Sequence, residues 1–148
     1  MIANNYKKQD AENWISKAAK KDADQQLALR VYTSRLIGQN PDLVMHGGGN
    51  TSVKVEKENL FGETCKVMHV KGSGWDLDTI LAPGLPGLWL EPLKKLRELE
   101  RLSVEEMVNI QRANLLDSGS PNPSVETLLH AFLPVSYTHL TLPTILLV

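Results

Sequence analysis

The sequence predicts a mixed α/β domain, and three observations support this prediction. Apolar residues recur at helical spacing before residue 40, short strand-like runs separated by glycine-rich turns occupy the middle, and helix-capping signals follow residue 100. The 148 residues suffice for one domain and are few for two. We therefore expect a central β-sheet with flanking helices rather than a regular alternation of strands and helices.

Composition excludes several classes of protein. The chain has 16 Lys and Arg residues against 17 Asp and Glu, so no basic excess exists to neutralise nucleic-acid phosphates. A single cysteine, Cys65, cannot form an internal disulfide, which favours a reducing compartment. The first residues lack the apolar core of a signal peptide, and no apolar run approaches the roughly 20 residues of a membrane span. We therefore expect a cytoplasmic protein with neither a nucleic-acid nor a membrane partner.

The first third of the chain indicates helices followed by strands. Residues 1–22 are polar and are typical of a loose arm or an early helix around Trp14. Residues 23–39 have apolar positions at helical spacing, and Gly38 lies near the expected end of that helix. Residues 43–46 and 51–55 then alternate as strands do, so the glycines between them predict a hairpin or a bulged turn.

The middle of the chain predicts two further strands and a helix. A charged loop over 56–63 leads to a strand over 65–70. Two prolines within 82–87 exclude a helix interior there, and 88–90 is typical of a short strand. The charged, amphipathic stretch 92–102 predicts a helix with a solvated face.

Two helix starts are predicted in the last third. Ser103 and Glu106 have the spacing of a capping box. The apolar face of the helix that follows consists of Val104, Met107, Val108, Ile110 and Leu115. Asn122 before Pro123 is a favoured N-cap followed by an N1 proline, so we expect a second helix over 124–132.

Two glycine-rich turns are the first candidates for a binding site. Residues 47–52 read Gly-Gly-Gly-Asn-Thr-Ser, and residues 71–74 read Lys-Gly-Ser-Gly. Glycines let the backbone approach an anion closely, and the hydroxyl, amide and ammonium groups add donors. Neither turn has the pattern of a nucleotide-binding motif. Two such turns predict a phosphate or carboxylate cradle, and the alternative is two tight turns without a ligand.

A third candidate segment, Pro-Ser-Val-Glu over 123–126, places a hydroxyl and a carboxylate at an expected helix start. Taken alone, Glu126 is more simply a charge that stabilises the helix start. The histidines His46, His69 and His130 have no metal-ligand spacing, so we expect each to be packed or exposed and predict no metal site.

Four segments, in this order along the chain, resemble the class II aldolase/adducin family. They are Ser34–Gly38, His46–Lys54, Val70–Leu77 and Pro121–Pro134. Within that family the chain is similar to the N-terminal part of bifunctional enzymes that join a rhamnulose-1-phosphate aldolase to a short-chain alcohol dehydrogenase. The resemblance covers roughly residues 25–134. It implies a class II aldolase-like α/β/α layered fold, incomplete here, with a central β-sheet and flanking helices.

The resemblance also implies roles for single residues. The substrate-phosphate-binding set would be Gly49, Asn50, Ser73, Gly74 and Ser124. Glu126 would be the catalytic acid/base. Val125 stands where some members have a phosphate-binding serine, so the resemblance does not carry that contact over to this chain. The implied substrate is a sugar phosphate, and the implied assembly of the full-length protein is a homo-oligomer.

Zn²⁺ in this family polarises the ketose carbonyl and hydroxyl and stabilises the enediolate left by carbon–carbon cleavage. Its ligands are a His-x-His pair shortly after the glutamate helix and a third histidine further on. Residues 1–134 contain no such ligands, and NAD would serve only the dehydrogenase half, which is also missing. We therefore expect a zinc-dependent lyase in the full-length protein and no activity from this chain.

The last stretch of the sequence predicts a boundary at residue 134. Residues 135–144 match, in order, one translated frame of the mosaic-end adapter used in transposase-based sequencing. We therefore interpret residues 1–134 as the N-terminal portion of the family domain and residues 135–148 as a non-native tail. His139 then imitates part of the zinc motif by accident. The alternative is a natural Thr-rich strand.

Two other functions remain open at this stage. The same turns would serve a dehydratase or epimerase that acts on a sugar phosphate. A non-catalytic, adducin-like binding domain would keep the fold without the chemistry, although Glu126 beside intact turns argues against it.

Overall fold

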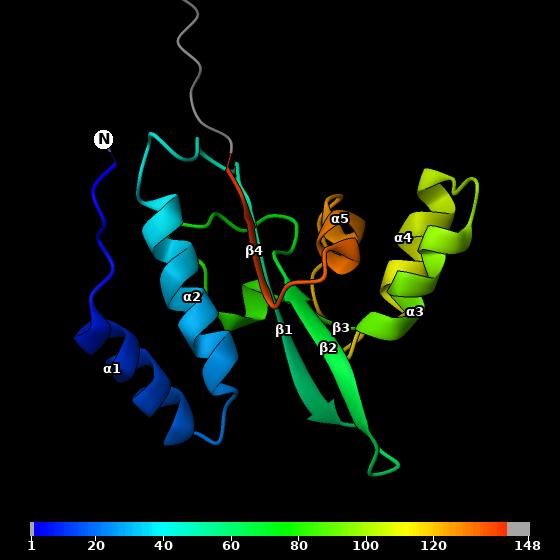
Figure 1. Cartoon of the computed structure of the whole chain (residues 1–148), viewed down its shortest axis with the longest axis horizontal. Coiled ribbons are helices and arrows are strands. Elements are labelled where there is room, and N and C mark those ends of the chain that lie inside the picture. The colour runs from blue at the N-terminus through cyan, green and yellow to red at the C-terminus, as the bar shows by residue number, and fades with distance from the viewer. Residues whose placement is uncertain (1, 142–148) are drawn as a thin grey trace, which may run out of the picture.

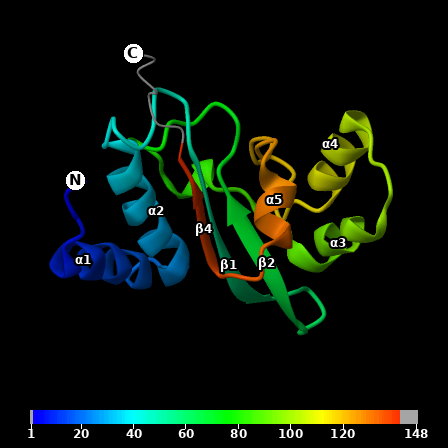
Figure 2. The same ribbon diagram turned by 45° about the horizontal axis from the view of Figure 1, so that its top comes forward.

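A computed structural model describes residues 2–141 and shows a β-sheet with helices on both faces. Helices α1 and α2 lie on one side, and α3, α4 and α5 lie on the other, in both views (Figures 1 and 2). The helices are α1 (Lys8–Ala19), α2 (Gln25–Gly38), α3 (Leu90–Lys95), α4 (Val104–Ala113) and α5 (Thr127–Phe132), with short 3-10 turns at Ala82–Gly84 and Leu96–Glu98. The strands are β1 (Asn50–Glu58), β2 (Thr64–Val70), β3 (Gly87–Trp89) and β4 (Tyr137–Leu140). This arrangement confirms the predicted α/β class.

The sheet is antiparallel, with strand order β3-β2-β1-β4. Strands β1 and β2 form one long hairpin in which Ser52 lies opposite Val70 and Glu58 opposite Thr64. The predicted hairpin between 43–46 and 51–55 is wrong, because residues 41–43 form a turn and β1 pairs with β2 instead. The loop predicted over 56–63 corresponds to the tip of this hairpin, but the tip spans only residues 59–63, because β1 continues to Glu58.

Successive side chains of the central strands point to opposite faces of the sheet, so the core that they form has one layer on each face. Val53, Val55 and Val67 point toward α2, where Leu27 packs against them. Met68 and Val70 point the opposite way and pack with residues of β3, α3 and α5. The sheet therefore needs helices on both faces. Within residues 2–141, no helix is long and apolar enough to cross a membrane.

The helices of the last third differ from the predicted ones. The stretch 92–102 forms only the end of α3 and a 3-10 turn, and it becomes irregular after residue 98. The capping box of Ser103 and Glu106 is confirmed, with both reciprocal hydrogen bonds present. The predicted apolar face of α4 is mostly not buried, since Val104 is 73% exposed and Val108 is 37% exposed. Helix α5 begins at Thr127 rather than at residue 124, so Pro123 is not its N1 residue.

The described part of the tail, residues 135–141, joins the sheet. Residues 137–140 form β4, which pairs antiparallel with the first residues of β1. Arg30 of α2 donates from Nη2 to the Thr138 carbonyl at 2.5 Å, and its guanidinium lies over the Tyr137 ring. In the structure, residues 137–140 therefore pack as part of the fold. The adapter origin of the segment stays a prediction about the coding sequence, and residues 142–148 lie outside the described part.

Candidate functional site

The antiparallel register brings the two glycine-rich turns together. The first turn ends where β1 begins and the second follows the end of β2, and these two strand ends lie side by side. The third segment joins them through its backbone: Ser124 N–H donates to the Lys71 carbonyl at 3.1 Å, and Ser73 N–H donates to the Asn122 carbonyl at 2.8 Å. All three candidate segments thus meet at one end of the sheet.

Asn50 is the residue that links the candidate side chains. Its Nδ2 donates to Ser124 Oγ at 2.7 Å and to Glu126 Oε2 at 3.3 Å, across more than seventy positions of sequence. Asn50 is 2% exposed and Ser124 is 8% exposed, while Glu126 is half-buried. The structure therefore places one amide, one hydroxyl and one carboxylate in a single hydrogen-bonded group.

This group leaves defined atoms available to a ligand. Asn50 Oδ1 is buried and has no hydrogen-bond partner among residues 2–141. The Ser124 hydroxyl accepts from Asn50, so its own proton is available for donation. Phosphate binding through Asn50 Nδ2 would replace one of its two present hydrogen bonds. The site can therefore offer Ser124 Oγ–H to an anion directly, and the Asn50 amide after a local rearrangement.

Lys71 places a cation against the first glycine turn. Its side chain is almost fully buried, and its Nζ donates to the Gly47 carbonyl at 3.3 Å. Its backbone N–H donates to the Thr51 carbonyl at 3.0 Å, which continues the β1–β2 pairing past the strand end. A positive charge held at this position favours an anion at the turn.

Gly49 shows why the first turn is built from glycine. It adopts φ +73°, and a Cβ there would lie 2.5 Å from Val44 Cγ1 and 3.2 Å from the Leu140 carbonyl oxygen. Both the conformation and the close packing exclude a side chain. Gly74 in the second turn also has a positive φ, of 84°, but a Cβ there would meet no atom within 4 Å from the other described residues, its two chain neighbours aside. Ser73 and Gly74 are exposed, and Ser73 joins the site through its backbone only.

His130 is a component of the site region that the sequence did not single out. It is fully buried on α5, one helical turn after Glu126, and its Nδ1 lies 2.7 Å from Ser52 Oγ on β1. Burial, together with the positive charge of Arg30, lowers the pKa of His130 to about 4, so its imidazole is neutral at pH 7. The spacing of four residues between Glu126 and His130 places both on one helix face, and this signal was available in the sequence.

The other histidines have structural surroundings. His69 is buried, its Nδ1 lies 2.9 Å from the Leu85 carbonyl oxygen, and burial lowers its pKa. His46 is exposed beside the first turn. Across residues 2–141 no three His, Cys, Asp or Glu side chains are grouped so that they could hold a metal ion. The residues present therefore do not fit a zinc centre.

A groove of about 480 Å³ opens beside the first glycine turn. Its walls come from the end of α2, from residues 44–48 and from residues 76–78. Gly47 and Gly48 line this groove, while Asn50 and Glu126 do not. The groove gives the glycine turn an open side next to the hydrogen-bonded group.

Comparisons with known proteins agree with the fold. No protein-family model matches the chain. The chain is 45% identical over 112 residues to an uncharacterized oxidoreductase, YuxG, of Bacillus subtilis (strain 168), and the match covers 74% of this chain and 16% of that protein. A solved N-terminal class II aldolase domain of a conserved protein from Thermoplasma acidophilum is 40% identical, with a TM-score of 0.71.

That structural match covers 76% of this chain and 52% of the solved chain. This chain therefore spans about half of the solved domain structure and a small part of the curated relative. The antiparallel sheet between two helical layers, together with this similarity, identifies the fold as that of a class II aldolase domain.

Proposed function

We propose that this chain supplies the phosphate-binding turns and the acid/base carboxylate of an aldolase that cleaves a ketose 1-phosphate. Rhamnulose 1-phosphate, split to dihydroxyacetone phosphate and lactaldehyde, is the substrate we favour. The observation that carries the proposal is the contact of one Asn50 amide with both Ser124 and Glu126. The phosphate-binding and proton-transferring groups that the sequence suggested would then lie in one site.

Each group would have a separate task in such a reaction. Lys71 and the glycine backbone would hold the substrate phosphate, and Ser124 would donate a hydrogen bond to it. Retro-aldol cleavage removes a proton from a hydroxyl group and later delivers one to the carbon released from the broken bond. Glu126 is half-buried and can accept and return a proton, which general acid/base catalysis requires. Fixing the phosphate end would keep the reacting carbons beside this carboxylate.

The remaining parts of the proposal concern the longer protein. The zinc ion expected for this family would be held by residues outside 1–134, so we propose that this chain alone is inactive. The curated relative is named as an oxidoreductase and is much longer than the match. We propose that the full-length protein combines the aldolase with an NAD-dependent oxidoreductase domain, and that it works as a cytoplasmic homo-oligomer.

The phosphate-binding part can be tested on the 148-residue chain. Titration with dihydroxyacetone phosphate or with inorganic phosphate, followed by NMR, should shift the backbone amides of residues 47–52 and 71–74. Asn50→Ala should weaken this binding, because it removes the group that links Ser124 and Glu126. Asn13→Ala, on the exposed surface of α1, is the matched control and should bind as the unmodified chain does. Shifts confined to other segments would contradict the phosphate site.

The catalytic part requires the gene restored beyond codon 134. Glu126→Gln keeps the shape but removes the exchangeable proton, so kcat should fall by about 10²–10⁴. Asn50→Ala should raise KM more than it lowers kcat, because it acts on substrate binding. Glu105→Gln on the exposed surface of α4 is the control. Near-normal turnover by Glu126→Gln would show that Glu126 is only a charge next to α5.

A further inference from the structure

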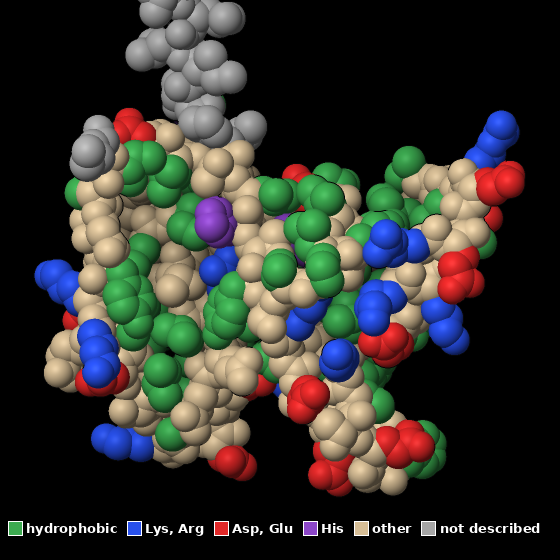
Figure 3. Space-filling model, viewed as in Figure 1, with side chains coloured by type: hydrophobic (Ala, Val, Ile, Leu, Met, Phe, Trp, Pro, Cys, Tyr) green, Lys and Arg blue, Asp and Glu red, His purple; other side chains and the backbone are tan. Residues whose placement is uncertain are grey.

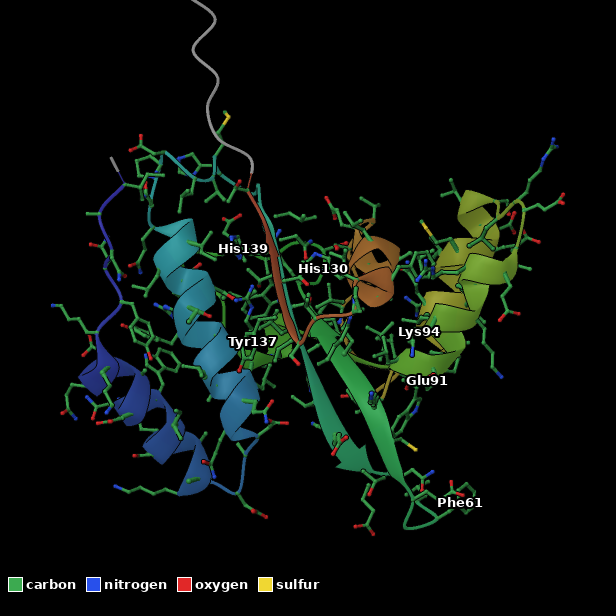
Figure 4. All side chains as sticks on the ribbon, viewed as in Figure 1. Phe61, Glu91, Lys94, His130, Tyr137 and His139 are labelled. Atoms are coloured by element: carbon green, nitrogen blue, oxygen red, sulfur yellow. The ribbon has the colours of Figure 1, made fainter. Side chains whose placement is uncertain are left out.

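A second hydrogen bond joins β1 to the segment that carries Glu126, beside the one that Asn50 makes. His130 Nδ1 of α5 lies 2.7 Å from Ser52 Oγ of β1, and both side chains are fully buried. Figure 4 shows His130 on the side of α5 that faces the sheet. This contact takes no part in the proposed phosphate binding or proton transfer.

The two hydrogen bonds have matching spacings on the strand and on the helix. Asn50 and Ser52 are two residues apart on β1, so their side chains leave the same face of the sheet about 7 Å apart. His130 N–H donates to the Glu126 carbonyl at 3.2 Å, and such a helical turn rises by about 6 Å. Asn50 therefore meets Glu126 where Ser52 meets His130, and sliding the helix by one turn along β1 would break both contacts.

Apolar packing alone defines the position of α5 less well. The helix has six residues, too few to be stable by itself, so its placement comes from tertiary contacts. Its inner side packs into the core through Leu128, Ala131 and Phe132. On its outer side hydrophobic side chains lie at the surface (Figure 3), and Leu129 is exposed. Because apolar contacts have no preferred direction, they fix the rotation of a short helix less well than a buried hydrogen bond does.

Glu126 lies between two anchored positions of its segment. On one side, Ser124 N–H donates to the Lys71 carbonyl at 3.1 Å. On the other side, His130 is joined to Ser52. The Glu126 side chain is half-buried, and the hydrogen bond that its carboxylate accepts is long, at 3.3 Å. The place of this carboxylate therefore depends on the two anchors more than on its own contact.

We propose that His130, held by Ser52, is a positioning residue that keeps the Glu126 carboxylate beside the Asn50 amide. Since His130 is fully buried, it acts through the helix and not on a substrate. The effect on catalysis rests on the proposed function, in which Glu126 transfers protons. The effect on geometry is independent of that function, because it concerns only the contact between Glu126 and Asn50.

The geometry is tested on the 148-residue chain through the side-chain amide signals of Asn50 in proton–nitrogen NMR spectra. Glu126→Gln removes the charge that Asn50 Nδ2 contacts, so it should shift these signals. In chains that also carry Ser52→Ala or His130→Leu, the same Glu126→Gln change should shift them by less than half as much, because the side chain at 126 has moved away from Asn50.

Ser34→Ala is the matched control for Ser52→Ala. Ser34 is also fully buried, and its Oγ lies 2.8 Å from Thr51 Oγ1, on the opposite face of β1. The chemical change is the same, but the lost hydrogen bond leads to α2, so the shift caused by Glu126→Gln should keep its full size.

The backbone amide signals show whether each variant is folded, and Ser52→Ala alone decides the outcome if His130→Leu is not. A full-sized shift from Glu126→Gln in the folded variants would overturn the proposal. An equal reduction in the Ser34→Ala chain would overturn it as well, because any lost buried hydrogen bond would then loosen the site.

The catalytic effect is tested with the gene restored beyond codon 134. Ser52→Ala and His130→Leu should each lower kcat by about tenfold or more and change KM by less than about twofold, because the phosphate-binding turns stay intact. His130→Asn should recover most of the loss, since its amide can bond to Ser52 in place of Nδ1. Neither change should lower kcat further in a Glu126→Gln enzyme, which has no catalytic carboxylate left to position.

The two proposals fail in different ways. Near-normal turnover by Glu126→Gln would contradict the proposed function, and the NMR result would still decide the positioning role. Normal kcat for Ser52→Ala and His130→Leu, in an enzyme that does need Glu126, would overturn the positioning role alone.

Discussion

Two glycines of the candidate site separate the contribution of backbone conformation from that of packing. Gly49→Ala combines a positive φ with a contact of 2.5 Å to Val44, so it should lower the free energy of unfolding by about 2–4 kcal/mol. Gly74→Ala has the positive φ alone and should cost about 1 kcal/mol. Urea denaturation of both variants measures the difference. Equal losses would mean that the turn around Gly49 relaxes without cost.

His130 should make stability depend on pH below neutrality. Its pKa is about 4 in the folded protein, against about 6.5 in the unfolded chain. Between these values the unfolded chain binds a proton that the native state excludes. The free energy of unfolding should therefore fall as pH drops from about 6.5 to 4, by up to about 1.4 kcal/mol per pH unit, and level off below.

Urea denaturation across this pH range, with His130→Asn as the comparison, isolates the effect. His69 also has a lowered pKa, but it is present in both proteins and cancels in the difference. The variant should lose the part of the pH dependence that comes from His130. Identical pH profiles for the two proteins would contradict the assignment.

At the scale of elements, β4 pairs with a strand edge that would otherwise be open. Apart from β4, no strand within residues 2–141 pairs with that side of β1, and an open edge can pair with extended segments of many sequences. Residues 137–140 contain Tyr and Thr, which favour strands. A segment without evolutionary selection can therefore pair there, so its pairing does not decide between a native strand and a translated adapter.

Truncation after Pro134 measures what β4 contributes. The sequence alone predicts no destabilisation, whereas the structure predicts a loss of about 1–3 kcal/mol, because Arg30 would lose its carbonyl acceptor. Denaturant unfolding of residues 1–134 against the whole chain tests this, and an unchanged free energy would support the sequence-based expectation. Reading the genomic locus past codon 134 decides the origin of the segment independently of its stability.

At the scale of the whole molecule, we predict that the 148-residue chain retains no stoichiometric zinc. A zinc site needs three or four suitably spaced ligands, and no such group occurs in residues 2–141. Elemental analysis of tag-free protein after gel filtration is the measurement. About one tightly held zinc per chain would contradict the prediction and would require ligands supplied in another way.

The sequence was most informative where the pattern is local. The strand-type alternation in β1 and β2, the capping box at Ser103 and the helical spacing of α2 each arise from neighbouring residues, and all three features are present in the structure. Which strands pair with each other was predicted less well. The glycines at 47–49 suggested a hairpin turn between adjacent strands, but β1 pairs with β2 across the tip at 59–63.

For the candidate site, too, the sequence indicated single residues but not how distant segments meet. The sequence alone pointed to Asn50, Ser124 and Glu126, beside two glycine-rich turns, as candidates for anion binding and proton transfer, and the order of these motifs suggested the family.

Only the tertiary structure decided that one Asn50 amide joins the other two residues. It also showed that Ser52 orients a buried His130 and that Gly38 is glycine because a Cβ would lie 2.2 Å from the backbone of Asp78. The physical reason is that hydrogen bonds and close contacts between distant segments depend on strand register and on helix placement. These are set by the packing of the whole core, and a local pattern of residues does not encode them.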